Sequence, residues 1–192
     1  MTRLHLVRHG PTHAKTMVGW SDLPADLSDT AAIARLSAHL PQSATVVSSD
    51  LSRASATADA IQNNRPRLPH HPALREIHFG DWELRSFREV EAEDPDHIRA
   101  YWETPGDICP PGGESWHQVC ARVNAAIDTL ITTHPNSDLI IVAHFGVILT
   151  QIQRAENLSA DAVFGHKIDN LSVTELTRLA NGWQTGRINH QP

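Results

Sequence analysis

Apolar and polar positions along the chain predict several strands. Residues 3–7 alternate polar and apolar side chains and then meet a turn at Gly10-Pro11. Residues 138–143 contain a continuous apolar run, which is typical of a strand buried on both faces of a parallel sheet. Residues 44–48 predict another short buried strand, and residues 72–79 predict an extended segment.

Segments with helical spacing separate these strands. Ile33, Leu36 and Leu40 are spaced as on one face of a helix, between a cap at Asp29 and a stop at Pro41. The longest helix is expected to begin at Ser115. The other expected helices run from a cap at Asp50 or Ser52 to about residue 62, from 86 to 102 with a break at Pro95, and from 146 to 155.

Strands that alternate with helices indicate βαβ units. We therefore expect one domain over residues 1–192, with a three-layer α/β/α architecture in which helices flank a mostly parallel central sheet. Residues 172–179 and 183–188 are expected to add a C-terminal hairpin across Asn181-Gly182. In such sheets a functional site lies beyond the carboxyl ends of the strands.

Charge and hydropathy narrow the classes of partner. The formal net charge of -6 argues against nucleic acid as a partner. No apolar run reaches the roughly 18 residues that a membrane-spanning helix needs. Residues 1–7 lack the pattern of a signal peptide. We therefore expect a cytoplasmic protein with no membrane partner.

Thirteen histidines raise the question of a metal site. The sequence has no His-Glu-x-x-His motif, and His70-His71 lie beside prolines in an expected loop. The two cysteines, Cys109 and Cys120, have no second pair at zinc-site spacing, and we expect both to be reduced thiols. We therefore expect neither a metal ion nor another cofactor.

Reactive side chains follow three of the predicted strands. Arg8-His9 ends the first strand, His144 follows the apolar strand, and Arg53 comes shortly after the strand at residues 44–48. Glu76 lies within the extended segment. If these strands are neighbours, the side chains meet in one crevice.

This set of side chains suits phosphoryl transfer. Arg8 and Arg53 present guanidinium forks that match phosphate oxygens. His9 can act as a covalent nucleophile when its attacking nitrogen is unprotonated. Its other ring nitrogen is expected to donate to a carbonyl near Gly10, which would set the tautomer.

Two further residues complete the expected chemistry. His144 is expected to donate to a phosphoryl oxygen, together with the first N–H groups of the helix that begins near Gly146. Glu76, with a raised pKa, is expected to protonate the leaving oxygen and then to activate water. Each residue alone has an ordinary alternative: His144 as a core histidine, Glu76 as a surface carboxylate, Arg53 as a helix-surface cation. Their joint position at element ends favours the site.

These residues lie in segments that resemble a known family. The segment Leu6-Val7-Arg8-His9-Gly10-Pro11-Thr12 resembles the opening signature of the histidine phosphatase superfamily, which has the phosphoglycerate mutase-like fold. Four later segments resemble that family in the expected order, so that the resemblance covers the chain from Leu4 to about Leu176. They are Ser48-Ser49-Asp50-Leu51-Ser52-Arg53-Ala54, Leu74-Arg75-Glu76-Ile77-His78-Phe79-Gly80-Asp81-Trp82-Glu83, Pro111-Gly112-Gly113-Glu114-Ser115 and Val142-Ala143-His144.

The resemblance implies a role for each matching residue. It implies that His9 is the phospho-acceptor, that Arg8, Arg53 and His144 form the phosphate pocket, and that Glu76 is the proton donor. Thr12 is expected to lie near the phosphate, with capping of the turn as its structural alternative.

The chain departs from the family pattern at three positions. Many members carry Asn where this chain has Lys15, which is expected either to reach the phosphate or to be a surface residue. Phe145 separates His144 from the glycine that usually follows it, and is expected to narrow the pocket or to pack in the core. Leu84 stands where many relatives have Gly.

A lid-like helical insertion is expected at about residues 81–113. Its aromatic residues are expected either to cover a substrate, with Trp82 as a binding residue, or to pack on the core; they are Trp82, Phe87, Tyr101 and Trp102. Family mutases are usually longer, so the modest insertion favours a phosphatase. The pattern is most similar to the phosphatase branch that contains α-ribazole phosphatases and broad-specificity sugar phosphatases.

The expected activity is metal-independent hydrolysis of a small-molecule phosphate monoester, such as α-ribazole phosphate or a sugar phosphate. Three alternatives stay open: phosphoglycerate mutase-type phosphoryl transfer, a phosphoprotein phosphatase, and a non-catalytic protein that binds a phosphate ligand. Dimers are common in this fold, so a homodimer also stays open.

Overall fold

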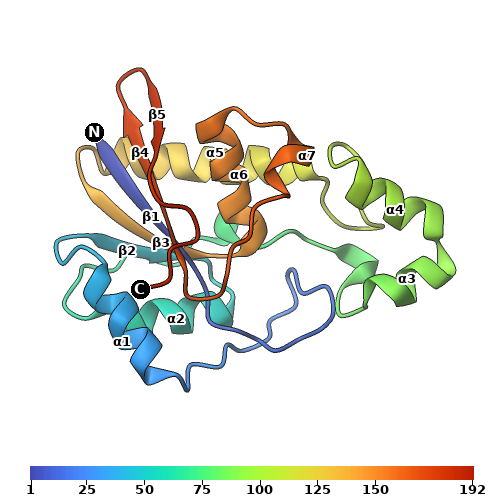
Figure 1. The fold of residues 1–192 in the computed structure, drawn as a ribbon, viewed down its shortest axis with the longest axis horizontal. Helices are drawn as coiled ribbons and strands as arrows, with labels where there is room; N and C mark the ends of the chain where they lie inside the picture. The colour runs from blue at the N-terminus through green and yellow to red at the C-terminus, as the bar shows by residue number, and fades with distance from the viewer.

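A five-stranded sheet runs through the centre of the computed structural model, which describes residues 1–192 (Figure 1). Its strands stand in the order β2-β3-β1-β4-β5. They are β1 (Thr2–Arg8), β2 (Thr45–Ser48), β3 (Asp138–Ala143), β4 (Val173–Leu179) and β5 (Gly182–Thr185). Strands β2, β3 and β1 are parallel, and the expected hairpin β4-β5 adds two strands, of which β4 pairs antiparallel to β1 and to β5. The mostly parallel α/β fold is therefore confirmed.

Helices cover both faces of this sheet. On one face lie α1 (Thr30–His39) and α2 (Ser52–Gln62), and on the other lie α5 (Trp116–Thr133) and α6 (Phe145–Glu156). The remaining helices are short: α3 (Phe87–Glu93), α4 (Pro95–Glu103), α7 (Ala160–Val163), and the 3-10 turns η1 (Pro72–Leu74) and η2 (Gly80–Trp82). None of the helices has the length and apolar composition that a bilayer span requires.

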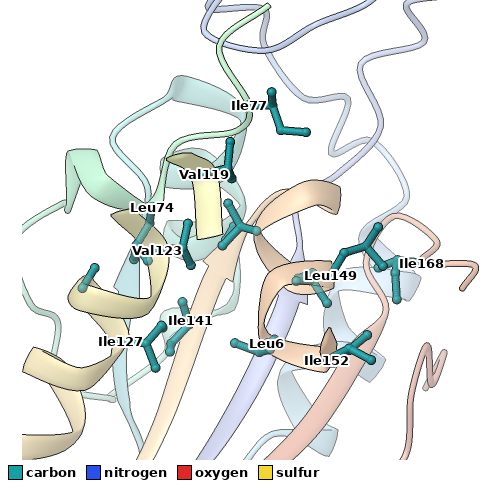
Figure 2. Close-up of a cluster of buried hydrophobic side chains, with 14 of the residues drawn as sticks. Leu6, Leu74, Ile77, Val119, Val123, Ile127, Ile141, Leu149, Ile152 and Ile168 are labelled. Atoms are coloured by element: carbon teal, nitrogen blue, oxygen red, sulfur yellow. The ribbon is translucent and has the colours of Figure 1, made fainter. Parts of the chain in front are cut away.

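Strand β3 packs against both helical layers, and this accounts for its continuous apolar run. Leu139 and Ile141 belong to the core under α5 and α6, whereas Ile140 and Val142 belong to the core under α1 and α2. Figure 2 shows Ile141 beside Val123 and Ile127 of α5. Each of these β3 side chains is fully buried, which stabilises the fold by about 1.5–3 kcal/mol per residue.

The prediction of an extended segment at residues 72–79 is wrong over Pro72–Leu74, which form η1, and the segment does not join the sheet. It contains η1 and then irregular backbone. Its carbonyl groups are bound elsewhere: the Arg122 guanidinium donates to the carbonyls of Ala73, Arg75 and Glu76. These side-chain bonds satisfy carbonyl groups that no strand or helix pairs.

The start of α2 also differs from expectation. Neither Asp50 nor Ser52 caps the helix with its side chain. The Asp50 carboxylate instead binds Arg75 at 2.6 and 2.8 Å, and the N–H of Ser52 donates to Asp22 at 2.7 Å. The Asp22 carboxylate, from a distant loop, therefore accepts an N–H of the first turn, as a capping side chain would.

Residues 81–113 form a helical hairpin that extends to the right in Figure 1. Its helices α3 and α4 begin at the caps Ser86 and Asp94, and Pro95 occupies the first turn of α4, where its missing N–H costs nothing. Leu84 adopts φ +62°, the left-handed region that favours glycine. A glycine would adopt this conformation without strain, which agrees with the glycine expected at this position from the family resemblance.

The carboxyl ends of the three parallel strands lie at one edge of the sheet. Arg8 stands opposite Ala143, and Ser48 stands opposite Val142. The chain after each strand therefore enters the same crevice, which is the location that open α/β sheets use for function.

Candidate active site

His9 is held in one orientation directly after β1. Its Nδ1 lies 2.7 Å from the carbonyl oxygen of Gly10, the expected hydrogen bond. A carbonyl can only accept, so the proton resides on Nδ1 and the lone pair is on Nε2. The backbone is fixed as well: the His9 N–H donates to Ala143, and the His9 carbonyl accepts from the Asn170 side chain at 2.8 Å.

The surroundings of His9 keep its imidazole neutral. Only 6% of the His9 surface is exposed. Burial is the main influence that lowers its pKa to about 3, and the charges of Arg53 and Arg8 act in the same direction against the Gly10 hydrogen bond. The Nε2 lone pair is therefore available at neutral pH.

Arg53 reaches His9 from the first turn of α2. Its Nε lies 3.3 Å from His9 Nε2, and its two terminal nitrogens donate to the carbonyls of Gly19 and Ser21 at 2.6 and 2.9 Å. Arg8 lies at the end of β1, donates to the Ile168 carbonyl, and lies over the ring of Phe145, 5.5 Å from its centroid. Two guanidinium groups thus lie close to the neutral imidazole.

His144 is fully buried at the start of α6, with its ring centroid 5.0 Å from that of His9. Neither of its ring nitrogens has a hydrogen-bond partner within the protein. Burial, followed by His9 and Arg53, lowers its pKa well below the usual value. The ring lies beside His9 but is not part of the cleft surface.

Glu76 faces the same group from the segment after η1. Its carboxylate accepts from the N–H groups of Ile77, at 3.0 Å, and Gly146, at 3.1 and 3.2 Å. Burial raises its pKa, although these hydrogen bonds and the charges of Arg53 and Arg8 oppose the shift. The Gly146 N–H, which we expected to face a phosphate, is therefore bound to Glu76.

A cleft of about 270 Å³ opens over this group. The charged and catalytic candidates on its wall are Arg8, His9, Arg53 and Glu76, with Thr12 beside them. The rest of the wall is mainly apolar: Ala14, Thr16, Met17, Val18, Phe79, Trp102 and Phe145. The sequence left two alternatives for Thr12 and for Phe145, and both residues lie on the cleft wall.

Two residues expected at the substrate lie elsewhere. The Lys15 side chain is exposed and is not part of the cleft wall. Trp82 is 3% exposed and packs edge-on against Tyr101, with ring centroids 5.4 Å apart, and against His97 at 5.0 Å. Trp82 is therefore a core residue. Trp102, about two turns after the α4 cap Asp94, supplies the aromatic surface at the cleft instead.

Sequence reasoning missed two residues that support the site. The Thr57 hydroxyl accepts from the Gly10 N–H at 2.9 Å and donates to the Arg53 carbonyl at 2.7 Å, so it joins the turn after β1 to α2. Asn170 holds the His9 carbonyl from a loop before β4. Thr57 lies three residues after the family-like segment that ends at Ala54, whereas nothing in the local sequence marks Asn170.

Comparison with known proteins agrees with this geometry. The family model of the histidine phosphatase superfamily (branch 1) matches residues 4–191. The chain is 31% identical over 175 residues to an adenosylcobalamin/alpha-ribazole phosphatase of Salmonella typhimurium, covering 87% of this chain and 86% of that protein. It is 32% identical to a metal-independent phosphoserine phosphatase of Arabidopsis thaliana, covering 77% and 66%.

Solved structures show the same fold. YhfR of Bacillus stearothermophilus superposes with a TM-score of 0.90 at 26% identity, covering 98% of this chain and 97% of that one. A mycobacterial glucosyl-3-phosphoglycerate phosphatase superposes with a TM-score of 0.85 at 25% identity, covering 99% of both chains. The chain therefore belongs to branch 1 of the histidine phosphatase superfamily and is a phosphatase of that class.

Proposed function

We propose that this phosphatase hydrolyses a small-molecule phosphate monoester in two steps through phosphorylated His9. The observation that carries the proposal is the fixed, neutral imidazole, whose Nδ1 is bound to Gly10 and whose Nε2 faces the guanidinium of Arg53. A neutral nitrogen of fixed direction is what nucleophilic attack on phosphorus requires.

In the first step, Nε2 of His9 attacks phosphorus, the P–N bond forms and the ester P–O bond breaks. Arg8 and Arg53 stabilise the charge on the non-bridging oxygens, and a ring N–H of His144 is a further donor. Glu76 transfers its proton to the leaving alcohol oxygen. The raised pKa of Glu76 supports this role, because a buried carboxyl holds a proton at higher pH.

In the second step, the ionised Glu76 takes a proton from water, the water oxygen attacks phosphorus, and the P–N bond breaks. Inorganic phosphate leaves and His9 is regenerated. No metal ion is needed in this scheme, because the guanidinium and imidazole groups supply the stabilising charge.

The cleft wall supports a substrate with an apolar or flat alcohol portion. Met17, Val18 and Trp102 face the same cleft as the phosphate-binding candidates. Arg8 and Arg53 are the only cationic residues on its wall, so no third cation is present to bind a second anionic group such as a carboxylate. This composition favours an ester whose only anionic group is the phosphate, and α-ribazole phosphate is of that kind, over a phosphoglycerate, which also carries a carboxylate.

The chain is proposed to act as one domain, in which the hairpin at 81–113 forms part of the cleft wall through Trp102. We also propose a cytoplasmic location. The free thiols of Cys109 and Cys120 support it, since reduced cysteines are usual in a reducing compartment.

The test is hydrolysis of 1-naphthyl phosphate in the presence of chelator, comparing the wild type with His9→Ala. Rapid acid-free quenching with radiolabelled phosphate donor should trap a base-stable, acid-labile phosphoenzyme in the wild type only. His117→Ala is the matched control, because this exposed histidine pairs with Asp107 and neither residue lines the cleft. Activity lost to chelator, or retained in His9→Ala, would refute the proposal.

A further inference from the structure

Five hydrogen bonds converge on the carboxylate of Glu83, which does not line the cleft. It accepts from the backbone N–H groups of Gly19, Trp20 and Ser21 at 3.1, 2.7 and 3.2 Å. It also accepts from the Ser21 hydroxyl at 2.5 Å and from the Phe79 N–H at 3.1 Å. Burial opposes ionisation of this carboxyl, but the hydrogen bonds outweigh burial and its pKa is lowered.

The segment 19–21 is bound on its other side by Arg53. The carbonyls of Gly19 and Ser21 accept from the two terminal nitrogens of that guanidinium, at 2.6 and 2.9 Å. The N–H groups of this short segment therefore bind a carboxylate while its carbonyls bind the guanidinium beside His9.

The segment has little freedom to move away from this arrangement. A Cβ atom on Gly19 would overlap the carbonyl oxygen of Ile77 and the Oε1 atom of Glu83. The residues just before this segment are also fixed. The Met17 carbonyl accepts from the Leu84 N–H at 2.8 Å, and the Met17 N–H donates to the Arg85 carbonyl at 2.9 Å. The loop is thus packed at contact distance on the segment that contains Glu83.

We propose that Glu83 is a positioning residue for Arg53. It acts through residues 19–21. Its charge orders three successive N–H groups, and the carbonyls of Gly19 and Ser21 hold the guanidinium fork toward His9. The inference rests on the proposed function, since it takes Arg53 to be a phosphate-binding residue. Small displacements of such a group from its productive geometry are costly to catalysis.

A double-mutant cycle tests this role. The proteins are the wild type, Glu83→Gln, Arg53→Ala and the double variant, and the readouts are kcat/KM for 1-naphthyl phosphate and the inhibition constant of inorganic phosphate. Glu83→Gln removes the charge and replaces one accepting oxygen by an amide nitrogen, which can only donate. We expect it to lower kcat/KM at least about tenfold and to weaken phosphate inhibition when Arg53 is present. With Arg53→Ala, the same change should cost less than about twofold.

Glu89→Gln is the matched control, because Glu89 binds Ser86 in the capping box of α3 and touches neither the cleft nor residues 19–21. It should leave kcat/KM unchanged. If Glu83→Gln does not fold, Ser21→Ala removes one donor to the carboxylate and enters the same cycle.

Equal losses from Glu83→Gln with and without Arg53 would overturn the inference, because a scaffold residue acts independently of the guanidinium. The proposed function fails in a different way. An inhibition constant of phosphate that is unchanged in Arg53→Ala would show that Arg53 does not bind phosphate. That result would also refute the role inferred for Glu83.

Discussion

The hydroxyl of Thr57 offers a direct test of how the turn that carries His9 is held. Thr57 is fully buried, and its oxygen is the partner of the Gly10 N–H at 2.9 Å. Thr57→Val keeps the shape and the β-branch of the side chain but removes this acceptor. Thr57→Ser keeps the acceptor and removes one methyl group.

The two variants separate the hydrogen bond from the packing. In Thr57→Val a buried N–H loses its partner, which costs about 1–3 kcal/mol of unfolding free energy. In Thr57→Ser the lost methyl group costs about 1 kcal/mol. For a chain of this size each kcal/mol lowers Tm by about 2–4 °C. We also expect a larger loss of kcat in Thr57→Val, because the Gly10 carbonyl sets the His9 tautomer.

Urea titration followed by tryptophan fluorescence gives both free energies, and kcat for an aryl phosphate gives the second readout. The expected order of stability is wild type, then Thr57→Ser, then Thr57→Val. A Thr57→Val protein that is as stable and as active as Thr57→Ser would refute the reasoning, since the Gly10 N–H would then be satisfied without the hydroxyl.

Three other variants follow from the site. Because the pKa of His9 is lowered to about 3, its contribution to stability is present above pH 6.5 and is lost as pH falls toward 3. Relative to His9→Gln, the wild type should lose about 1.4 kcal/mol per pH unit below 6.5 in urea titrations; parallel curves would contradict this. Gly146→Ala places a Cβ 2.5 Å from Glu76 Oε1 and should lower kcat at least about tenfold, whereas Gly106→Ala, with 3.5 Å to its nearest neighbour, should not. Trp102→Ala should raise KM for 1-naphthyl phosphate more than for glucose 6-phosphate, and equal changes would argue against an apolar subsite.

The sequence predicted those elements whose local pattern and tertiary environment agree. Strand β3 is apolar from Leu139 to Ala143 because both of its faces are buried, and α5 begins after Ser115 because a complete capping box is encoded there. The segment at 72–79 was misassigned because a distant side chain, Arg122, binds its carbonyls. No local pattern contains such a partner.

The same distinction applies to the cleft. The residues that follow strand ends were expected to converge because parallel strands share a carboxyl edge, and Arg8, His9, Arg53 and Glu76 do line one cleft. The choice between Trp82 and Trp102 depends on how the hairpin docks on the core, which periodicity alone does not determine. Lys15 takes the surface alternative of its two expected positions, and the sequence could not decide between them because the loop conformation determines which side chains turn inward.

The central position of β1 has a consequence for the order in which the enzyme is assembled. Its ladder partners are β3, which begins at Asp138, and β4, which ends at Leu179. Strand β1 is therefore synthesised long before either of its neighbours, and pairing at such sequence separation slows folding. His9, the proposed nucleophile, is synthesised well before β3 and β4, but its backbone N–H gains its partner, the Ala143 carbonyl, only after β3 has been made.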